Sequence, residues 1–438
     1  MTSGASYNVA ANDTGAHNPS EDLGPLRAGQ TVAIVGGGPA GSSCAIKLMR
    51  LAEKTNTSIR VLIFERKDFS VEQNVCVGVL SPPFQRLLGE LGLTLPQDIV
   101  QRHIKGYMLH SRRETIYLEE KDKDGEETLV VDRSDLDSFL LESARKAGAI
   151  VMDDTVVDIR GAPDKVLVVG SGGARVLADV VVGAFGLDNC ALSIFEAHVP
   201  GYHRPSVTKS ILTEVAIGEE AVNARLGDTI HALLTDQLPR VEFGALTPKR
   251  DHVTVNVAGD NITDDDLDAF LSLPWTRKLV PEATLKESRY YNVFPSGPAQ
   301  NLYGDRIVTI GNTSGLLRPL KGKGINTGII TGIEAARTMM EVGISKHAFD
   351  DFYLHCHELT DEFRYGNFLR ALYRLSRRLH VLDAVLALAR REPLLYQDFY
   401  EMVAGEGSYR EIVRRSARLD LVAKIIVAIA RYQLLRSA

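Results

Sequence analysis

Cysteine is scarce in this chain of 438 residues, which has only Cys44, Cys76, Cys190 and Cys356. The four are far apart, which excludes the paired spacing of a disulfide framework or a structural zinc site. So few cysteines suit a reducing compartment, and we expect a cytoplasmic protein. Neighbouring residues on a helix point in different directions, so we expect no metal at the sequence His355–His357.

Long apolar runs are also missing. No run reaches the roughly 20 residues that a membrane-spanning helix needs. Residues 1–28 have neither the basic start nor the apolar core of a signal peptide, and their polar composition predicts a disordered leader. The formal net charge of -6 argues against a nucleic acid as partner.

The most informative stretch present is Thr31–Arg66. An apolar run typical of a buried strand is followed by Gly36, Gly38 and Gly41, then by a helical pattern and a second apolar run that ends at Glu65. The glycines permit a tight turn, close approach of a pyrophosphate, and close helix packing, while the acid can accept hydrogen bonds from a ribose. Together these features predict a dinucleotide site.

The rest of the chain predicts an α/β fold with a Rossmann-like, three-layer domain around a parallel sheet. Alternating patterns predict an inserted antiparallel sheet, and the last part is helical throughout. The expected division is a leader at 1–28, a discontinuous dinucleotide domain at 29–105, 132–190 and 300–345, a substrate sheet at 106–131 and 200–299, and a helical region at 346–438.

Several motifs together resemble one family. These are GGGPAG with Glu65, the stretch DRSDLDSFL that contains Arg133, the turn Gly311–Gly315, and the Pro-x-x-Gly-x-Gly-Ile-Asn sequence at 319–326. They resemble the FAD-dependent oxidoreductases of the p-hydroxybenzoate hydroxylase type. Within that group, CVGVLSP at 76–82 and the C-terminal helical sequence are similar to the geranylgeranyl reductases.

The resemblance implies FAD as the cofactor. Arg133 would face its diphosphate; the alternative is a surface cation. Asn312 stands where the family usually has an aspartate that contacts the phosphate and ribityl groups. Asparagine keeps a hydrogen-bond acceptor for this role; alternatively, Asn312 is only a turn residue. The helix after Gly324 would stabilise reduced flavin through its N-terminus. The implied cofactor residues are Gly36, Gly38, Pro39, Ala40, Gly41, Glu65, Arg66, Arg133, Asn312, Gly322, Gly324, Ile325 and Asn326.

The resemblance also implies a substrate cavity beside the flavin ring. Cys76 would be the catalytic residue there, as a proton donor or positioning thiol; alternatively it is a small wall residue. The implied substrate-binding residues are Gly78, Leu80, Phe243, Ala245, Pro248 and Pro319.

The sequence departs from the family in three places. Phe185-Gly186 replaces the usual Asp-Gly, and Phe243–Pro248 has lost two aromatics of a cavity motif. Trp275 is the only tryptophan, so the tryptophan pair of the halogenases is absent.

The leading hypothesis is therefore an enzyme that reduces carbon–carbon double bonds of an isoprenoid or lipid-like substrate, with hydride from reduced flavin. The alternatives are an aromatic or polyketide monooxygenase, and a flavin electron-transfer or lipid-binding protein without its own substrate chemistry. Electrons would come from NAD(P)H or a carrier protein. The basic C-terminal helix, with Val422, Ile425, Ile426 and Ile429 on one face, would contact the inner face of a membrane peripherally or pack on the protein body.

Overall fold

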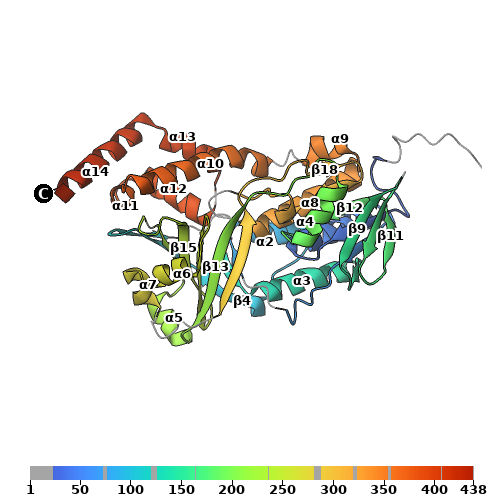
Figure 1. The fold of residues 1–438 in the computed structure, drawn as a ribbon, viewed down its shortest axis with the longest axis horizontal. Coiled ribbons are helices and arrows are strands. Elements are labelled where there is room, and N and C mark those ends of the chain that lie inside the picture. The colour runs from blue at the N-terminus through green and yellow to red at the C-terminus, as the bar shows by residue number, and fades with distance from the viewer. Residues whose placement is uncertain are drawn as a thin grey trace, which may run out of the picture.

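The computed structural model describes residues 23–72, 76–119, 126–162, 164–234, 236–280, 288–318, 323–353, 357–405 and 407–437 (Figure 1). Its first sheet has six strands, and all of them run parallel except the edge strand β18. All five residues of the central strand β1 are buried, as expected for a strand covered on both faces. The order is β18 (Tyr303–Gly304), β19 (Ile307–Thr309), β12 (Val180–Gly183), β1 (Thr31–Val35), β2 (Arg60–Phe64) and β8 (Ile150–Met152).

Helix α1 (Pro39–Lys54) packs on this sheet between α8 (Gly324–Glu341) and α3 (Arg133–Lys146). The contact between α1 and α8 is close because α8 has glycines there: a Cβ on Gly332 would lie 2.6 Å from the Ala40 carbonyl oxygen. Beside the sheet stand β9 (Val156–Gly161), β10 (Val166–Gly170) and β11 (Arg175–Ala178), which form an antiparallel meander, with α4 (Asn189–His198) against β9.

The second large sheet has seven strands and is antiparallel except for the parallel pair β14 and β5. One face is covered by α5 (Glu219–Arg225), α6 (Asp264–Leu271) and α7 (Pro274–Leu279). The order is β17 (Arg289–Pro295), β13 (Val207–Ala216), β16 (His252–Gly259), β15 (Val241–Pro248), β14 (Thr229–Leu233), β5 (Gly106–His110) and β6 (Thr115–Glu119).

A small sheet of β3 (Val79–Leu80), β7 (Thr128–Val131) and β4 (Val100–Ile104) joins the two large ones. Leu80 and Val131 belong to the core around the six-stranded sheet, whereas Val130 belongs to the core that includes Tyr107 of the seven-stranded sheet. The chain then continues from β3 into α2 (Phe84–Glu90) and η2 (Gln97–Ile99). Strand β7 pairs with β3 on one side and β4 on the other, so it does not extend the seven-stranded sheet.

The C-terminal part is a layer of helices, as the sequence predicts. It comprises α9 (Lys346–Ala348), η5 (Phe349–Tyr353), α10 (His357–Arg378), α11 (Leu382–Ala389), α12 (Pro393–Ala404), α13 (Tyr409–Ser416) and α14 (Leu419–Ser437). Among the described residues, no helix is long and apolar enough to cross a membrane. The two sheets and the helical C-terminus confirm the predicted fold class.

The folded part begins before the expected boundary at residue 28. Leu26 is only 5% exposed, and its N–H donates to the Met339 carbonyl at 2.9 Å.

Candidate cofactor and active site

The site is built on one edge of the six-stranded sheet. Neighbouring strands β19, β12, β1 and β2 run parallel, so their carboxyl ends meet there, and this edge is where doubly wound sheets bind nucleotides. The segments that follow these strands include Gly36–Gly38, Glu65 and the turn η4 (Gly311–Thr313). The Thr313 hydroxyl donates to the Gly186 carbonyl at 3.0 Å, which ties two of these segments together.

The three glycines after β1 have different surroundings. A Cβ on Gly36, whose φ is +105°, would lie 2.5 Å from the Ala184 carbonyl oxygen, and one on Gly41 would lie 1.9 Å from the Gly36 carbonyl oxygen. A Cβ on Gly38 would meet no atom within 4 Å. Gly38 precedes α1 and offers it no side-chain cap, so the side chains leave the first N–H groups of the helix uncapped. Such helix N-termini are where proteins commonly bind phosphate groups. Pro39 and Ala40 form the start of that helix.

Glu65 lies against the glycine loop. One of its carboxylate oxygens accepts a hydrogen bond from the Gly37 N–H at 2.9 Å, and the other accepts from the Lys67 N–H at 2.8 Å. A carboxylate has about four acceptor positions, so two remain for ribose hydroxyls. The adjacent Arg66 is exposed to solvent.

Asn312 lies where the starts of α1 and α8 come together. A Cβ on Gly311 would be 2.8 Å from the Ala40 Cβ, and one on Gly324 would be 3.2 Å from the Asn312 Oδ1. Ile325, in the first turn of α8, is buried. Two of the predicted residues, Gly322 and Pro319, lie outside the described part of the chain.

The loop 76–83 is held from two sides. At α8, the Asn326 amide donates to the Ser81 carbonyl at 2.8 Å, and the Lys323 ammonium donates to the Pro82 carbonyl at 2.7 Å. At β7, a Cβ on Gly78 would lie 2.1 Å from the Val131 carbonyl oxygen. Leu80, predicted as a substrate-binding residue, is fully buried in the core around the six-stranded sheet.

Cys76 and Arg133 are brought together at the start of α3. The Arg133 Nε donates to the Asp137 carboxylate at 2.7 Å, and Asp137 is only 1% exposed. Burial lowers the pKa of Arg133, but the charge of Asp137, together with hydrogen bonds to Asp137 and the Cys76 sulfur, raises the pKa above its usual value. The guanidinium is therefore a permanent cation beside the half-buried thiol.

On the seven-stranded sheet, Phe243 and Ala245 are half-buried on the same face of β15, and the Phe243 ring lies 6.4 Å from that of Phe294. Side chains alternate along a strand, so Pro248 lies on the opposite face.

Sequence reasoning missed three polar residues on the face of Phe243. Each has a buried side-chain oxygen without a hydrogen-bond partner among the described residues. The alternation of polar and valine residues in β16 was the signal that could have identified two of them. They are Thr247, Thr254 and Asn256, which are 1%, 0% and 6% exposed.

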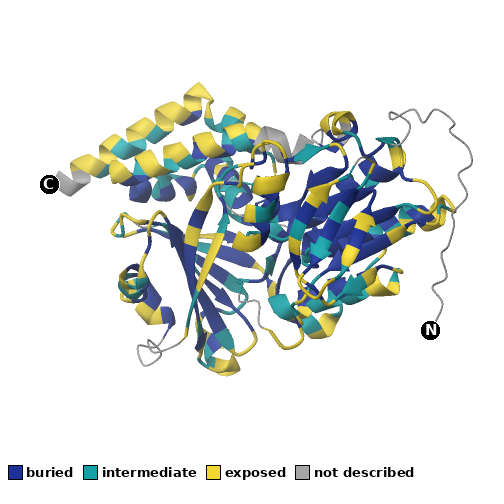
Figure 2. Cartoon of the chain, turned by 45° about the vertical axis from the view of Figure 1, so that its right-hand side comes forward, coloured by how far each residue is buried: buried dark blue, intermediate teal, exposed yellow. Residues whose placement is uncertain are grey.

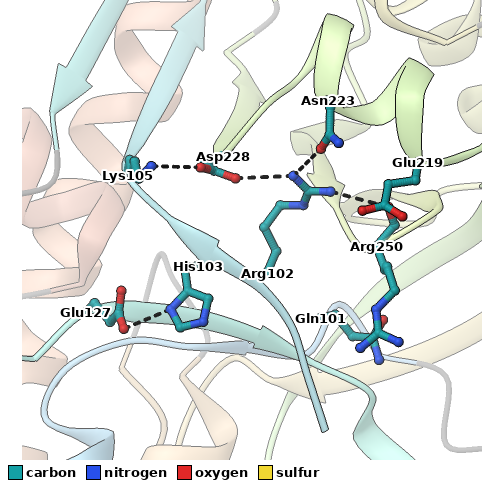
Figure 3. A pocket seen from close by; sticks show the side chains of 9 residues that line it. All are labelled: Gln101, Arg102, His103, Lys105, Glu127, Glu219, Asn223, Asp228 and Arg250. Carbon is teal, nitrogen blue, oxygen red and sulfur yellow. Dashed lines mark hydrogen bonds and ion pairs between the residues drawn. The ribbon is translucent and has the colours of Figure 1, made fainter. Parts of the chain in front are cut away.

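A groove of about 560 Å³ lies elsewhere, beside β4 and α5 (Figure 3). Its charged residues bind one another: Arg102 contacts Asp228 at 3.2 Å, Lys105 contacts Asp228 at 3.2 Å, and His103 contacts Glu127 at 2.8 Å. None of the residues predicted from sequence lines this groove.

A profile of the FAD-binding domain family matches residues 30–345. The chain belongs to this family. Its cofactor is FAD, and the flavoprotein is an FAD-dependent oxidoreductase that is geranylgeranyl reductase-like. The motif-based prediction of family, cofactor and enzyme class is confirmed.

Two curated relatives are similar to this flavoprotein. A geranylgeranyl diphosphate reductase of Synechocystis is 26% identical over 313 residues, which are 67% of this chain and 71% of the relative. A digeranylgeranylglycerophospholipid reductase of Methanocaldococcus jannaschii is 25% identical over 325 residues, which are 70% of this chain and 77% of the relative.

Solved structures show the same fold. A geranylgeranyl bacteriochlorophyll reductase-like protein of Thermoplasma acidophilum has a TM-score of 0.70 at 17% identity, covering 91% of this chain and 99% of that one. A 2-methyl-3-hydroxypyridine-5-carboxylic acid oxygenase has a TM-score of 0.59 at 16% identity, covering 81% of this chain and 92% of that one. The fold is therefore shared by a reductase-like protein and an oxygenase.

Proposed function

We propose that this flavoprotein reduces carbon–carbon double bonds of an isoprenoid or lipid-like substrate. The observation that supports this most is the position of Cys76 beside Arg133, on a loop held between the starts of α3 and α8. The names of the two curated relatives also describe reductases that act on geranylgeranyl compounds, which are isoprenoids.

We further propose how the chain divides the work of binding. The first turn of α1 with Gly36, Gly38 and Gly41 binds the diphosphate, and Glu65 binds the adenosine ribose. Asn312 and the first turn of α8, with Gly324, Ile325 and Asn326, bind the flavin end. Phe243 and Ala245 form part of an apolar wall, on which burial of each CH₂ group of the substrate contributes about 0.8 kcal/mol.

Bound FAD, once reduced, supplies a hydride. The adjacent carbon needs a proton, and the Cys76 thiol is the group in the loop that can give one. Arg133 lies beside the sulfur that gives up the proton. Asp137 holds the guanidinium in place through the 2.7 Å bond to Nε. In this proposal Arg133 and Asp137 act by positioning, and solvent returns the proton to Cys76.

The test is the mass of the product. FAD-loaded protein is incubated with geranylgeranyl compounds and a reductant, with and without O₂. A gain of two hydrogens per double bond, independent of O₂, is expected. A gain of one oxygen that requires O₂ would make the protein a monooxygenase. Reduction of an added quinone without any change of the substrate would make it an electron-transfer protein. The same assay with NAD(P)H or a reduced carrier protein identifies the electron donor.

The role of Cys76 is tested by Cys76→Ala, with Cys190→Ser as the matched control, because Cys190 is exposed on α4. Loss of a general acid lowers kcat by about 10²- to 10⁴-fold. We expect this loss for Cys76→Ala with unchanged FAD content and thermal stability, and no loss for Cys190→Ser. Full activity of Cys76→Ala would refute Cys76 as the proton donor while leaving the reductase proposal intact.

A further inference from the structure

Helix α10 carries a row of large apolar side chains that face solvent. Phe368, Leu372 and Leu375, together with Leu379 directly after the last residue of the helix, follow one another at spacings of three or four residues and are 55%, 49%, 50% and 55% exposed. This spacing places the first three on one side of the helix, and Leu379 follows them. The opposite side binds the seven-stranded sheet: Arg370 donates to Thr208 of β13 at 3.2 Å, and the Tyr373 hydroxyl donates to the Glu242 carbonyl of β15 at 2.6 Å.

Helix α14 has a second exposed apolar row. It consists of Leu419, Val422, Ile426, Val427 and Leu434, which are 87%, 37%, 61%, 47% and 71% exposed. The other side of this helix packs inward, where Leu421 is 1% exposed and Ile425 is partly buried in the cluster that contains Leu386 of α11. The sequence predicted that Ile425 and Ile426 share one apolar face of this helix. In the structure Ile425 is partly buried against the protein body, whereas Ile426 is exposed to solvent.

Both rows point away from the same sheet. Helix α10 lies directly on β13 and β15, and α14 lies on α11, which packs on β6. In Figure 1 these helices form a layer at one end of the molecule, with α14 at its outer edge, and Figure 2 shows exposed residues along α14. Helices α10 and α14 belong to one packed layer, because α10 contacts α13, α13 contacts α12, and α11 contacts both α12 and α14. We name the two exposed rows together the α10–α14 surface.

Charge distinguishes this surface from the rest of the chain. From Arg364 onward there are 14 Lys and Arg residues against 7 Asp and Glu residues, whereas the whole chain has a net charge of -6. Five arginines on α10, α13 and α14 have no ion pair within the described part of the chain: Arg364, Arg378, Arg410, Arg414 and Arg431.

Most of the described acids nearby are already neutralised. Glu392 binds Lys424 at 2.5 Å, Asp398 binds Arg415 at 2.8 Å, and Asp420 binds Arg418 at 3.1 Å. The α10–α14 surface is therefore apolar and cationic together.

We propose that the α10–α14 surface docks on an anionic lipid bilayer. Apolar side chains of an interfacial helix enter the boundary between headgroups and acyl chains, and flanking cations bind lipid phosphates. A second copy of the chain fits this surface less well. A two-fold dimer brings the same patch against itself, which would oppose arginine to arginine. This inference does not depend on the reductase proposal, because it concerns a different part of the chain.

The test is sedimentation of the full-length, FAD-loaded protein with vesicles. One set is phosphatidylcholine with a minor share of phosphatidylglycerol, and the other is phosphatidylcholine alone. We expect binding to the anionic vesicles that weakens with salt. The double variant Leu372→Gln and Leu375→Gln keeps helix-forming residues and should bind about tenfold or more weakly, from the apolar area withdrawn. Arg364→Gln with Arg378→Gln should remove most of the preference for anionic vesicles.

The matched control is Leu177→Gln, since Leu177 is 55% exposed on β11, far from the surface in the fold. It should leave vesicle binding unchanged, and circular dichroism should show that every variant is folded. Failure of the wild type to sediment with anionic vesicles would overturn the proposal. A wild-type dimer in solution that the Leu372→Gln, Leu375→Gln variant converts to a monomer would also overturn it, in favour of self-association.

Discussion

The nucleotide edge of the six-stranded sheet and the Phe243 face of the seven-stranded sheet are built in different ways. At the nucleotide edge, backbone atoms approach so closely that a Cβ on Gly41 would lie 1.9 Å from a carbonyl oxygen. On the Phe243 face, side chains make the surface, and Thr254 has a buried hydroxyl oxygen without a partner among the described residues. The first region is determined by where side chains are missing, and the second by which side chains are present.

The largest effect is expected when a side chain is added to the glycine loop of the nucleotide edge, where Gly41 is closely packed and Gly38 is not. Gly41→Ala places its Cβ against the Gly36 carbonyl and should cost about 3 kcal/mol or more of unfolding free energy, with loss of bound FAD. Gly38→Ala has open space, so its thermal stability should stay near that of the wild type while FAD affinity falls. Thermal unfolding and flavin absorbance after desalting measure the two quantities. Equal stability of the two variants would contradict the close packing at Gly41.

The difference between the nucleotide edge and the Phe243 face explains which parts of the site could be predicted from the sequence. The spacing of Gly36, Gly38 and Gly41 reflects backbone geometry, so a dinucleotide site at the end of a buried strand could be predicted from it. FAD in particular was predicted only through the resemblance of further motifs to a known family. The contact of Cys76 with Arg133 joins residues far apart in the chain, and it depends on tertiary packing of the loop, against Val131 at Gly78 and against α8 at Ser81 and Pro82. The opposite orientation of Pro248 and the burial of Leu80 depend on strand register, which composition does not determine.

Two buried histidines lie on the α7 side of the seven-stranded sheet. His110 Nε2 lies 2.9 Å from His231 Nδ1, and the ring of Trp275 lies 4.7 Å from that of His110. Burial, followed by the charge of Lys278, lowers the pKa of His110 to about 4. Burial, followed by His110, lowers the pKa of His231 to about 3.

Both histidines are neutral when folded and accept protons more readily when unfolded. The free energy of unfolding should therefore have its full value above about pH 6.5 and fall as the pH is lowered towards about 4. At about pH 5 the loss should be about 2 kcal/mol per histidine. Denaturant unfolding, followed by the fluorescence of the single tryptophan, measures this change. The variant His231→Gln should remove about half of the loss of unfolding free energy that the two histidines cause at low pH. An unchanged pH dependence in this variant would show that other groups cause it.

A smaller effect is expected on the Phe243 face. Thr254→Val removes a buried hydroxyl without a partner among the described residues, so stability should be unchanged or rise by up to about 1 kcal/mol. The matched control is Thr213→Val, because the Thr213 hydroxyl donates to the Ser288 carbonyl at 3.1 Å, and its loss should cost about 1 kcal/mol. Denaturant midpoints compare the two. A loss of stability in Thr254→Val would mean that its hydroxyl is bonded in solution.

The smallest effect is expected from Asn312→Asp, which restores the residue type usual in the resembling family. Asn312 already provides an acceptor oxygen. This oxygen, Oδ1, lies close to Gly324, since a Cβ on Gly324 would be 3.2 Å from it. FAD affinity should change only a few-fold, because one acceptor replaces another. Titration of the apoprotein with FAD measures it. A change of a hundredfold would show that the turn depends on charge rather than on backbone geometry.

The protein is proposed to reduce a carbon–carbon double bond. The most direct measurement reduces the protein without O₂, adds a geranylgeranyl compound, and follows the return of oxidised-flavin absorbance. The proposal predicts that the absorbance returns in the absence of O₂ and that Cys76→Ala slows the return. A flavin that stays reduced until O₂ is admitted, or is reoxidised only by a quinone, would contradict it.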